Sequence, residues 1–324
     1  MVLEGIGEPL VLKELASPSL LPDEVLVRVE ACGVCRTDLH VVDGELPLTR
    51  FPVVPGHEVV GVVERAGYNV KDCLPGTRVG VPWLGGTCGV CAYCTTGREN
   101  LCDYPEFTGC TRPGGFASHV VARAAFCIQL HDDADAVATA PLLCAGLIGW
   151  RCLKRVGDAR RIGLYGFGAA AHIIAQVATG QGREVFAFTR AGDAAAQSFA
   201  LSLGAAWAGG SDALPPKQLD AAIIFAPVGP LVPVALRAVR KGGRVVCGGI
   251  HMSDIPAFPY RLLWEEREVV SVANLAREDV RGFFSTAAAM DVKTTTKPYA
   301  LDRANNALAD LRDGAFSGAA VLVP

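Results

Sequence analysis

Five apolar segments, each followed by a stretch long enough for a helix, occupy the middle of the chain and most constrain its fold. They are residues 161–166, 185–189, 221–225, 243–248 and 269–273. Apolar strands that alternate with helices indicate βαβ units, in which the strands pair in parallel. We therefore predict an α/β fold with a parallel sheet over residues 146–273.

The first of these segments leads into a G-x-G-x-x-A turn and then a helix. Gly166 permits the tight turn, Gly168 lets the backbone approach a pyrophosphate, and Ala171 lets the helix pack on the strand. The pattern predicts a doubly wound Rossmann domain that binds a dinucleotide through residues of this turn, namely Gly166, Phe167, Gly168, Ala169 and Ala171.

The end of the second strand bears on the choice of cofactor. An acidic residue there would bind the adenosine ribose of NAD, whereas an arginine tolerates the extra phosphate of NADP. The chain has Thr189 and Arg190 at this point, with Asp193 three residues later. This favours NADP(H) over NAD(H). In the alternative, Arg190 points to solvent and Asp193 or a backbone group meets the ribose.

The flanking sequence has a different character. Residues 1–145 contain short strand patterns, at 24–29, 59–63 and 78–81, separated by glycine and proline. The last fifty residues contain a helical pattern at 302–311 and a strand pattern at 320–323. With 324 residues, the chain is long enough for two domains.

Two sets of residues have the chemistry of metal ligands. Four closely spaced cysteines on a glycine-rich loop suit a closed tetrahedral zinc site, with an iron–sulfur cluster as the alternative: Cys88, Cys91, Cys94 and Cys102. A dispersed set, Cys35, His57 and Cys144, can supply two thiolates and one imidazole with a fourth position left open. An open position on zinc lets an alcohol bind and lose its proton near neutral pH.

Taken together, the chain resembles the zinc-containing medium-chain dehydrogenase/reductase family, the alcohol dehydrogenases, over nearly its whole length. The resemblance is carried by Cys-Arg-Thr-Asp-Leu-His at 35–40, Gly-His-Glu at 56–58, the four-cysteine loop and the G-x-G-x-x-A turn, in the family's order. It implies a GroES-like β domain formed by residues 1–145 and 274–324 and a Rossmann domain at 146–273. The active site would lie in the cleft between them.

The resemblance also implies a role for individual residues. Cys35, His57 and Cys144 would hold a catalytic zinc ion, and Cys88, Cys91, Cys94 and Cys102 a structural one, giving two zinc ions per chain. Glu58 would be the carboxylate near the zinc, and Asp38 would orient His57. Thr37 and His40 would carry the alcohol proton to solvent, and Arg36 would meet the cofactor pyrophosphate.

Two features depart from the family pattern. The chain starts close to where the family's first strand should be under way, so we expect an N-terminal piece to be missing or disordered. Leu46 stands before Pro47, where family members that act on small alcohols carry a bulkier aromatic residue. We therefore expect a pocket lined by Leu46 and Trp83 that prefers medium-length or aromatic primary alcohols and aldehydes to ethanol.

The predicted function is reversible hydride transfer between such an alcohol and NAD(P)+, in a homodimer or homotetramer. A net charge of −3 argues against nucleic acid as a partner, and the longest apolar run, 221–236, is broken by three prolines. No leader pattern is present at the N-terminus, so we expect a cytoplasmic protein without a membrane partner. The alternatives are a zinc-dependent polyol or formaldehyde dehydrogenase, a zinc-free reductase of the same fold, and a non-enzymatic zinc or redox sensor.

Overall fold

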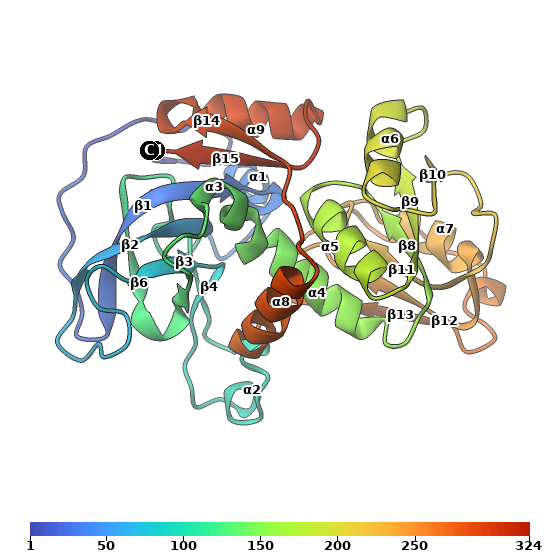
Figure 1. Ribbon diagram of the computed structural model, residues 1–324, viewed down its shortest axis with the longest axis horizontal. Coiled ribbons are helices and arrows are strands. Elements are labelled where there is room, and N and C mark those ends of the chain that lie inside the picture. The colour runs from blue at the N-terminus through green and yellow to red at the C-terminus, as the bar shows by residue number, and fades with distance from the viewer. The chain divides into compact units, whose positions relative to one another are not determined.

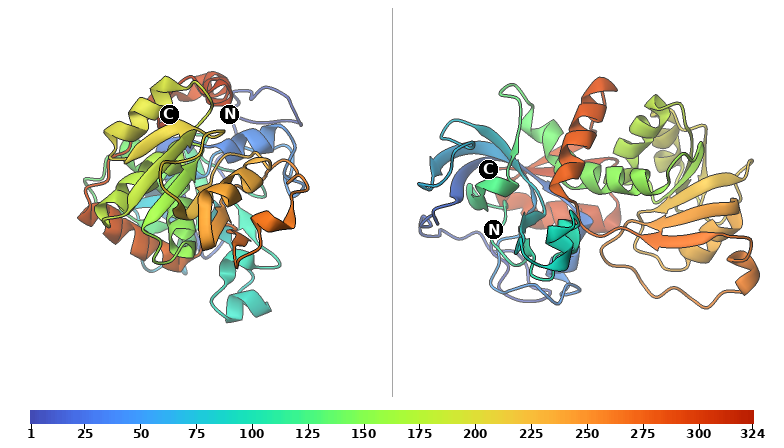
Figure 2. Two further views of the ribbon diagram at one scale, coloured as in Figure 1. Left: turned by 90° about the vertical axis from the view of Figure 1, so that its right-hand side faces the viewer. Right: turned by 90° about the horizontal axis from the view of Figure 1, so that it is seen from below.

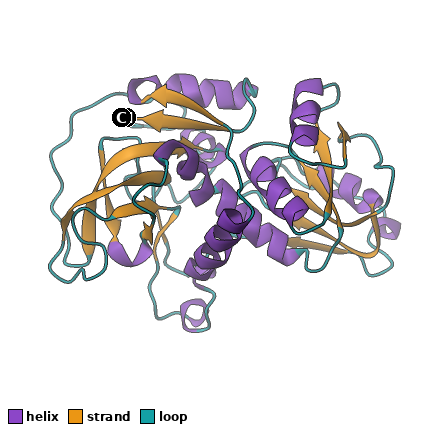
Figure 3. Cartoon of the chain, viewed as in Figure 1, coloured by secondary structure: helices purple, strands orange, loops and turns teal.

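The computed structural model describes all residues, Met1–Pro324, and divides them into two compact units. Unit 1 contains Met1–Ala145, Asn274–Val280 and Thr294–Pro324, and unit 2 contains Gly146–Ala273 and Arg281–Lys293. Figure 1 labels the elements along the chain, and Figure 3 separates helices from strands.

Unit 1 is built around a seven-stranded sheet in the order β14-β15-β1-β2-β3-β7, with β6 also paired to β1. Its strands are β1 (Glu24–Val34), β2 (Glu58–Ala66), β3 (Arg78–Val81), β6 (His119–Arg123), β7 (Ile128–Gln129), β14 (Thr296–Ala300) and β15 (Ala319–Val323). All of these pairings are antiparallel except that of β14 with β15. A separate two-stranded sheet joins β4 (Leu84–Gly86) to β5 (Glu106–Phe107).

The helices of unit 1 are short. They are α1 (Arg36–Val42), α2 (Ala92–Thr95), α3 (Ala136–Thr139) and α9 (Ala304–Asp313), with 3-10 turns at Glu99–Leu101, Ala124–Phe126, Ala140–Leu143 and Leu301–Arg303. The longest, α9, ends at Gly314, which adopts a left-handed conformation with φ of 72° and closes the helix. The helix and strand patterns at 302–311 and 320–323 therefore correspond to α9 and β15.

Unit 2 holds a six-stranded sheet in the order β10-β9-β8-β11-β12-β13, parallel throughout. Its strands are β8 (Arg161–Tyr165), β9 (Glu184–Thr189), β10 (Trp207–Gly210), β11 (Leu219–Ile224), β12 (Val239–Cys247) and β13 (Glu268–Ser271). The order moves outward from β8 in both directions, and right-handed crossovers then place helices on both faces (Figure 2, left). The predicted doubly wound sheet is confirmed.

The helices of unit 2 connect these strands. They are α4 (Ala145–Arg155), α5 (Ala169–Gly180), α6 (Ala194–Ser202), α7 (Leu231–Ala238) and a 3-10 turn at Tyr260–Leu262, while α8 (Arg277–Ala289) extends from unit 1 into unit 2. Helix α7 forms in the apolar run that prolines interrupt. Pro230 is its N-cap residue, and Pro233 lies in its first turn, where no intrahelical N–H bond is lost.

No single helix is long and apolar enough to cross a membrane. One bent pair, Ala136–Leu143 with Ala145–Arg155, passes that test by length and composition only.

Candidate metal centres and cofactor-binding turn

The start of α1 organises the first candidate site. Cys35 is the N-cap residue of this helix, and its backbone N–H donates to Asp38 Oδ2 at 2.8 Å. The other oxygen, Asp38 Oδ1, accepts from Gly56 N at 3.1 Å and lies 3.2 Å from His57 Nδ1. Asp38 is only 1% exposed, so these bonds hold the loop at 56–57 against the helix.

His57 is thereby oriented with one ring nitrogen satisfied and the other free. Both oxygens of Asp38 already accept backbone N–H groups, so we assign the proton of the third contact to His57 Nδ1. His57 is fully buried, and its Nε2 atom has no hydrogen-bond partner. A buried nitrogen without a partner costs free energy unless another group binds it. A metal ligand requires such a nitrogen, held in place by a bond at the other ring nitrogen.

The free nitrogen belongs to a compact set of donors. Cys35, His57, Glu58 and Cys144 each offer one ligand atom, and these atoms all lie within 4.8 Å of one another. The two sulfur atoms, of Cys35 and Cys144, are 3.9 Å apart and not bonded as a disulfide. Two soft sulfurs with one imidazole nitrogen fit zinc, and a carboxylate beside them leaves the fourth position exchangeable.

The pKa values of the side chains in this set are shifted strongly. The hydrogen bond from Cys144 holds the pKa of the Cys35 thiol well below its usual range, whereas the same contact raises the pKa of Cys144. Burial raises the pKa of Glu58, which is 2% exposed and lies against Gly33. A Cβ at Gly33 would come within 1.8 Å of Glu58 Oε2, so only glycine leaves room for the carboxylate there.

The four-cysteine loop forms the second set. The ligand atoms of its four cysteines also lie within 4.8 Å of one another. Backbone N–H groups already point at the sulfurs, with Cys88 N 3.3 Å from Cys102 Sγ and Cys91 N 3.4 Å from Cys88 Sγ. Backbone donors lower the pKa of Cys91 to about 6. Desolvation, in contrast, raises the pKa of Cys94 to about 12. Four sulfurs gathered within this distance fit a closed zinc site.

Helix α1 also carries the residues of the predicted proton relay. Thr37 and His40 are three positions apart and so share a face of the helix. Thr37 Oγ1 is 3.8 Å from Cys35 Sγ. The His40 Nδ1 atom contacts the Glu45 carboxylate, and Glu45 N donates to His40 O at 2.9 Å. Sequence reasoning missed Glu45, because nothing in the pattern marks a residue five positions beyond the histidine.

Trp83 lies directly beside His57. Their rings meet edge to face at 5.0 Å, and Trp83 stacks on Phe107 at 4.8 Å. The indole N–H donates to Asn274 Oδ1 at 3.1 Å. Asn274 was not singled out from the sequence, although its positive φ of 54° fits a residue type that tolerates the left-handed region. Leu46 is half-buried on the loop after α1.

The glycine-rich turn of unit 2 has the predicted conformation. Gly166 has a φ of 88°, and a Cβ there would meet Ala226 N at 2.9 Å. At Gly168, the N-cap residue of α5, an added Cβ would meet no protein atom within 4 Å. The protein's own packing therefore does not require glycine at 168, whereas a pyrophosphate held by the N-terminus of α5 does. Phe167 and Ala169 are half-buried in the turn, and Ala171 is buried.

The three polar residues at the end of β9 that could meet the adenosine ribose have different surroundings. The Thr189 hydroxyl is buried and donates to Arg190 O at 3.0 Å. The Asp193 carboxylate caps α6 by accepting from Ala196 N at 2.9 Å. Arg190 is exposed. Arg36, the remaining candidate, occupies the first position of α1 in unit 1.

Comparison with known proteins agrees with this chemistry. Residues 21–132 match the alcohol dehydrogenase GroES-like domain. A protein described as a probable alcohol dehydrogenase, AdhA, of Mycobacterium tuberculosis (strain CDC 1551 / Oshkosh) is 48% identical over 314 residues, which are 94% of this chain and 90% of that protein.

Two solved structures share the fold. A cinnamyl alcohol dehydrogenase of Sorghum bicolor superimposes with a TM-score of 0.87 at 25% identity, covering 95% of this chain and 92% of that one. A chain of Sinorhizobium meliloti 1021, designated a zinc-binding dehydrogenase and bound to NADP, gives a TM-score of 0.85 at 27% identity, covering 99% and 97%.

Proposed function

Because the chain belongs to the zinc-containing medium-chain dehydrogenase/reductase family, the alcohol dehydrogenases, we propose that it interconverts primary alcohols and aldehydes with NADP(H) at the Cys35, His57 and Cys144 centre. The observation that carries this proposal is the buried, unpartnered Nε2 of His57 beside two thiols. The family consists of enzymes, which removes the sensor alternative.

The two metal sites would have different tasks. Cys35, His57 and Cys144 would hold a catalytic zinc ion, and Cys88, Cys91, Cys94 and Cys102 a structural one. The catalytic ion, when bound, supplies a Lewis acid that acidifies the alcohol. Glu58 lies among the catalytic donors, and Asp38 fixes the ring of His57 from behind.

The chain's own residues would move the alcohol proton. The Thr37 hydroxyl would accept it and pass its own proton toward His40, one helical turn away on the same face of α1. Glu45 contacts Nδ1 of His40 and is exposed, so the proton would leave the relay to solvent through Glu45. General acid–base groups of this kind contribute about 10²–10⁴-fold to a rate.

Unit 2 would bind the cofactor. The α5 N-terminus and the open space at Gly168 suit a pyrophosphate. At β9, Asp193 is engaged in capping α6 and the Thr189 hydroxyl in bonding the backbone, so the exposed Arg190 is the group offered to a 2′-phosphate. This supports NADP(H).

The substrate would be a medium-length or aromatic primary alcohol. Leu46 would leave room beside Trp83 that a larger side chain would fill, and each buried methylene contributes about 0.8 kcal/mol. The aromatic alcohol in the name of the sorghum neighbour is consistent with this pocket. A polyol or formaldehyde dehydrogenase remains the alternative. Domain boundaries at 145/146 and 273/274, a homodimer or homotetramer, and a cytoplasmic location stay predictions.

The test is a substrate panel with both cofactors, combined with metal analysis. We expect two zinc ions per chain and a kcat/KM that rises from ethanol to hexanol and to benzyl or cinnamyl alcohol. We also expect mild chelation to remove one ion together with activity, while the second leaves later with loss of folding. Iron in place of zinc, or a kcat/KM that falls steadily with chain length, would contradict the proposal.

A further inference from the structure

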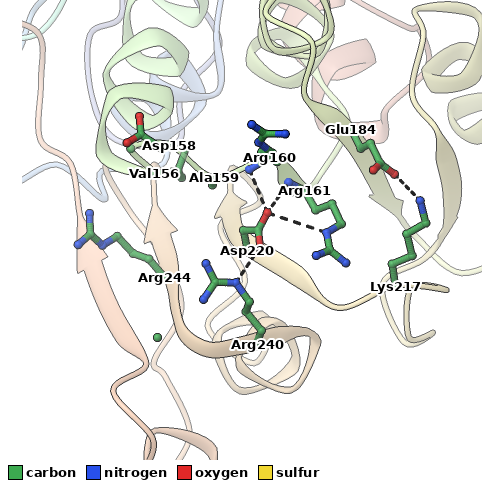
Figure 4. Close-up of a pocket in the computed structure, with 12 residues that line it drawn as sticks. Val156, Asp158, Ala159, Arg160, Arg161, Glu184, Lys217, Asp220, Arg240 and Arg244 are labelled. Carbon is green, nitrogen blue, oxygen red and sulfur yellow. Dashed lines mark hydrogen bonds and ion pairs between the residues drawn. The ribbon is translucent and has the colours of Figure 1, made fainter.

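A charged cavity opens at the edge of the unit 2 sheet where its strands begin (Figure 4). Its volume is about 760 Å³. Arg161 is the first residue of β8 and Glu184 the first of β9, and both line the cavity. The Gly166 turn follows the opposite, carboxyl end of β8, about 16 Å away for a five-residue strand. The cavity is therefore separate from the cofactor-binding turn.

A single carboxylate forms the floor. The side chain of Asp220 is 11% exposed and accepts three hydrogen bonds, from Arg160 N at 2.9 Å, Arg161 N at 2.8 Å and Arg240 Nε at 2.7 Å. The Arg161 guanidinium lies 4.0 Å from it. These contacts fix the starts of two strands and hold two guanidinium groups at the floor, as Figure 4 shows.

Positive charge prevails in the lining. Its cationic side chains are Arg160, Arg161, Lys217, Arg240 and Arg244, and its carboxylates are Asp158, Glu184 and Asp220. The lining thus has an excess of two positive charges, or of one when Glu268, which pairs with Arg244 at 2.9 Å, is counted, in a chain whose net charge is −3. Lys217 pairs with Glu184 at 2.7 Å. Arg160 is exposed and its guanidinium has no partner in the protein. A cation without a partner, beside others only partly neutralised, is available for an anion.

Backbone carbonyl groups at the rim of the cavity accept hydrogen bonds from arginine side chains. Helix α4 ends here, and a helix C-terminus normally repels anions. The last helical carbonyl, Arg155 O, accepts from Arg244 at 2.6 Å, and in the loop that follows Arg183 donates to Gly157 O at 2.9 Å and Ala159 O at 3.2 Å. Arginine side chains thus bind three of the carbonyl groups at this edge, which reduces their repulsion of an anion.

We propose that this cavity is a second binding site, for a small anion of the diphosphate class, held by Arg160, Arg161 and Arg240. Guanidinium groups form paired, charge-assisted hydrogen bonds with phosphate oxygens. Two phosphoryl groups can contact two of these guanidinium groups at once, and the cavity volume falls within the range of small-ligand sites. The ligand is either free diphosphate or the diphosphate of a nucleotide.

The test is calorimetric titration of the holoenzyme with inorganic pyrophosphate or with ADP at constant ionic strength. The protein carries one equivalent of NADPH per chain, which fills the cofactor site and leaves no excess NADPH, itself a diphosphate, to occupy the cavity. Arg160→Ala removes an exposed side chain without a partner, so folding should be unaffected. We expect it to weaken pyrophosphate binding about tenfold or more, and the Arg160→Ala/Arg161→Ala double variant to abolish it. The matched control is Arg261→Ala, an exposed arginine of unit 2 outside the cavity lining.

Each outcome decides the proposal. Equal affinity for pyrophosphate and ADP supports free diphosphate as the ligand, and tighter binding of ADP supports a nucleotide, provided that both depend on Arg160. Absence of saturable binding at millimolar pyrophosphate overturns the proposal. So does binding that is unchanged in the double variant or that falls equally in Arg261→Ala.

Discussion

The Asp38 carboxylate offers the sharpest test of the proposed catalytic centre. Its two oxygens serve three N–H donors, those of Cys35, Gly56 and His57, at 2.8, 3.1 and 3.2 Å. In Asp38→Asn one oxygen becomes an NH₂ group. Because all three partners are donors, either orientation of the amide sets donor against donor. With the NH₂ group toward His57, the ring loses the acceptor that fixes its tautomer; with the NH₂ group toward Cys35, the start of α1 that carries this proposed ligand loses its hydrogen bond.

The expected magnitude follows from the burial of this contact. Removing a group that orients a metal-bound imidazole costs about 10–100-fold in metal affinity or activity, equivalent to about 1.4–2.7 kcal/mol. Asp38 is 1% exposed and His57 fully buried, so water cannot replace the lost acceptor. We therefore expect the upper end of that range, near 100-fold.

Competition with a chromophoric chelator measures this directly, because it would resolve the two zinc equivalents per chain that we propose. In Asp38→Asn the first equivalent should leave about 100-fold more readily and kcat should fall with it, while the four-cysteine equivalent is unchanged. The matched control is Asp43→Asn, at the other end of α1, where the carboxylate is half-exposed and pairs with Arg312. Wild-type zinc retention in Asp38→Asn, or an equal loss in Asp43→Asn, would refute the reasoning.

Three other side chains give predictions, which stopped-flow kinetics, thermal unfolding and steady-state kinetics check in turn. Thr37→Val should lower the single-turnover rate about 10²–10⁴-fold at unchanged zinc content, because only the proton-accepting hydroxyl is lost; an unchanged rate removes Thr37 from the relay. Burial lowers the pKa of His172 to about 4 from 6.5, so the unfolded chain binds the extra proton between those values. The contribution of His172 to the free energy of unfolding should be complete above pH 6.5 and fall by about 3 kcal/mol toward pH 4. The free energy of unfolding of His172→Asn should fall less on acidification, and an equal fall in both proteins contradicts this. Arg190→Asp should reverse the ratio of kcat/KM for NADPH over NADH at fixed ionic strength, and an unchanged ratio excludes Arg190 from the cofactor site.

Local patterns in the sequence were enough to predict much of the fold. The strand, turn and helix around Gly166 formed as predicted, because a left-handed glycine is what joins β8 to α5. Strand β10 was missed, since two of its four residues are glycine and the segment shows neither alternation nor an apolar run. Helix α7 lies in the helix-length stretch predicted between the strands at 221–225 and 243–248, and its prolines, Pro230 and Pro233, lie where a helix start tolerates proline.

The candidate metal centre depends on the tertiary fold in a way that spacing alone cannot reveal. Cys144 lies 109 residues from Cys35, and only the packing of the turn before α4 brings their sulfurs to 3.9 Å. The resemblance to a known family supplied that pairing. Glu45 and Asn274 carry no motif, and their contacts with His40 and Trp83 exist only once the loops are folded.

The end of β9 shows how the structure narrows a choice that the sequence left open. Three polar residues lie there, Thr189, Arg190 and Asp193, and each could in principle meet the adenosine ribose. Thr189 is excluded by its buried hydroxyl, which bonds the backbone, and Asp193 is engaged as the cap of α6. A carboxylate that moved to a ribose would leave Ala196 N without its acceptor, at a cost of about 1 kcal/mol for a lost helix cap. No such cost attaches to Arg190, which is exposed, and this difference is why we propose Arg190 as the group that meets a 2′-phosphate.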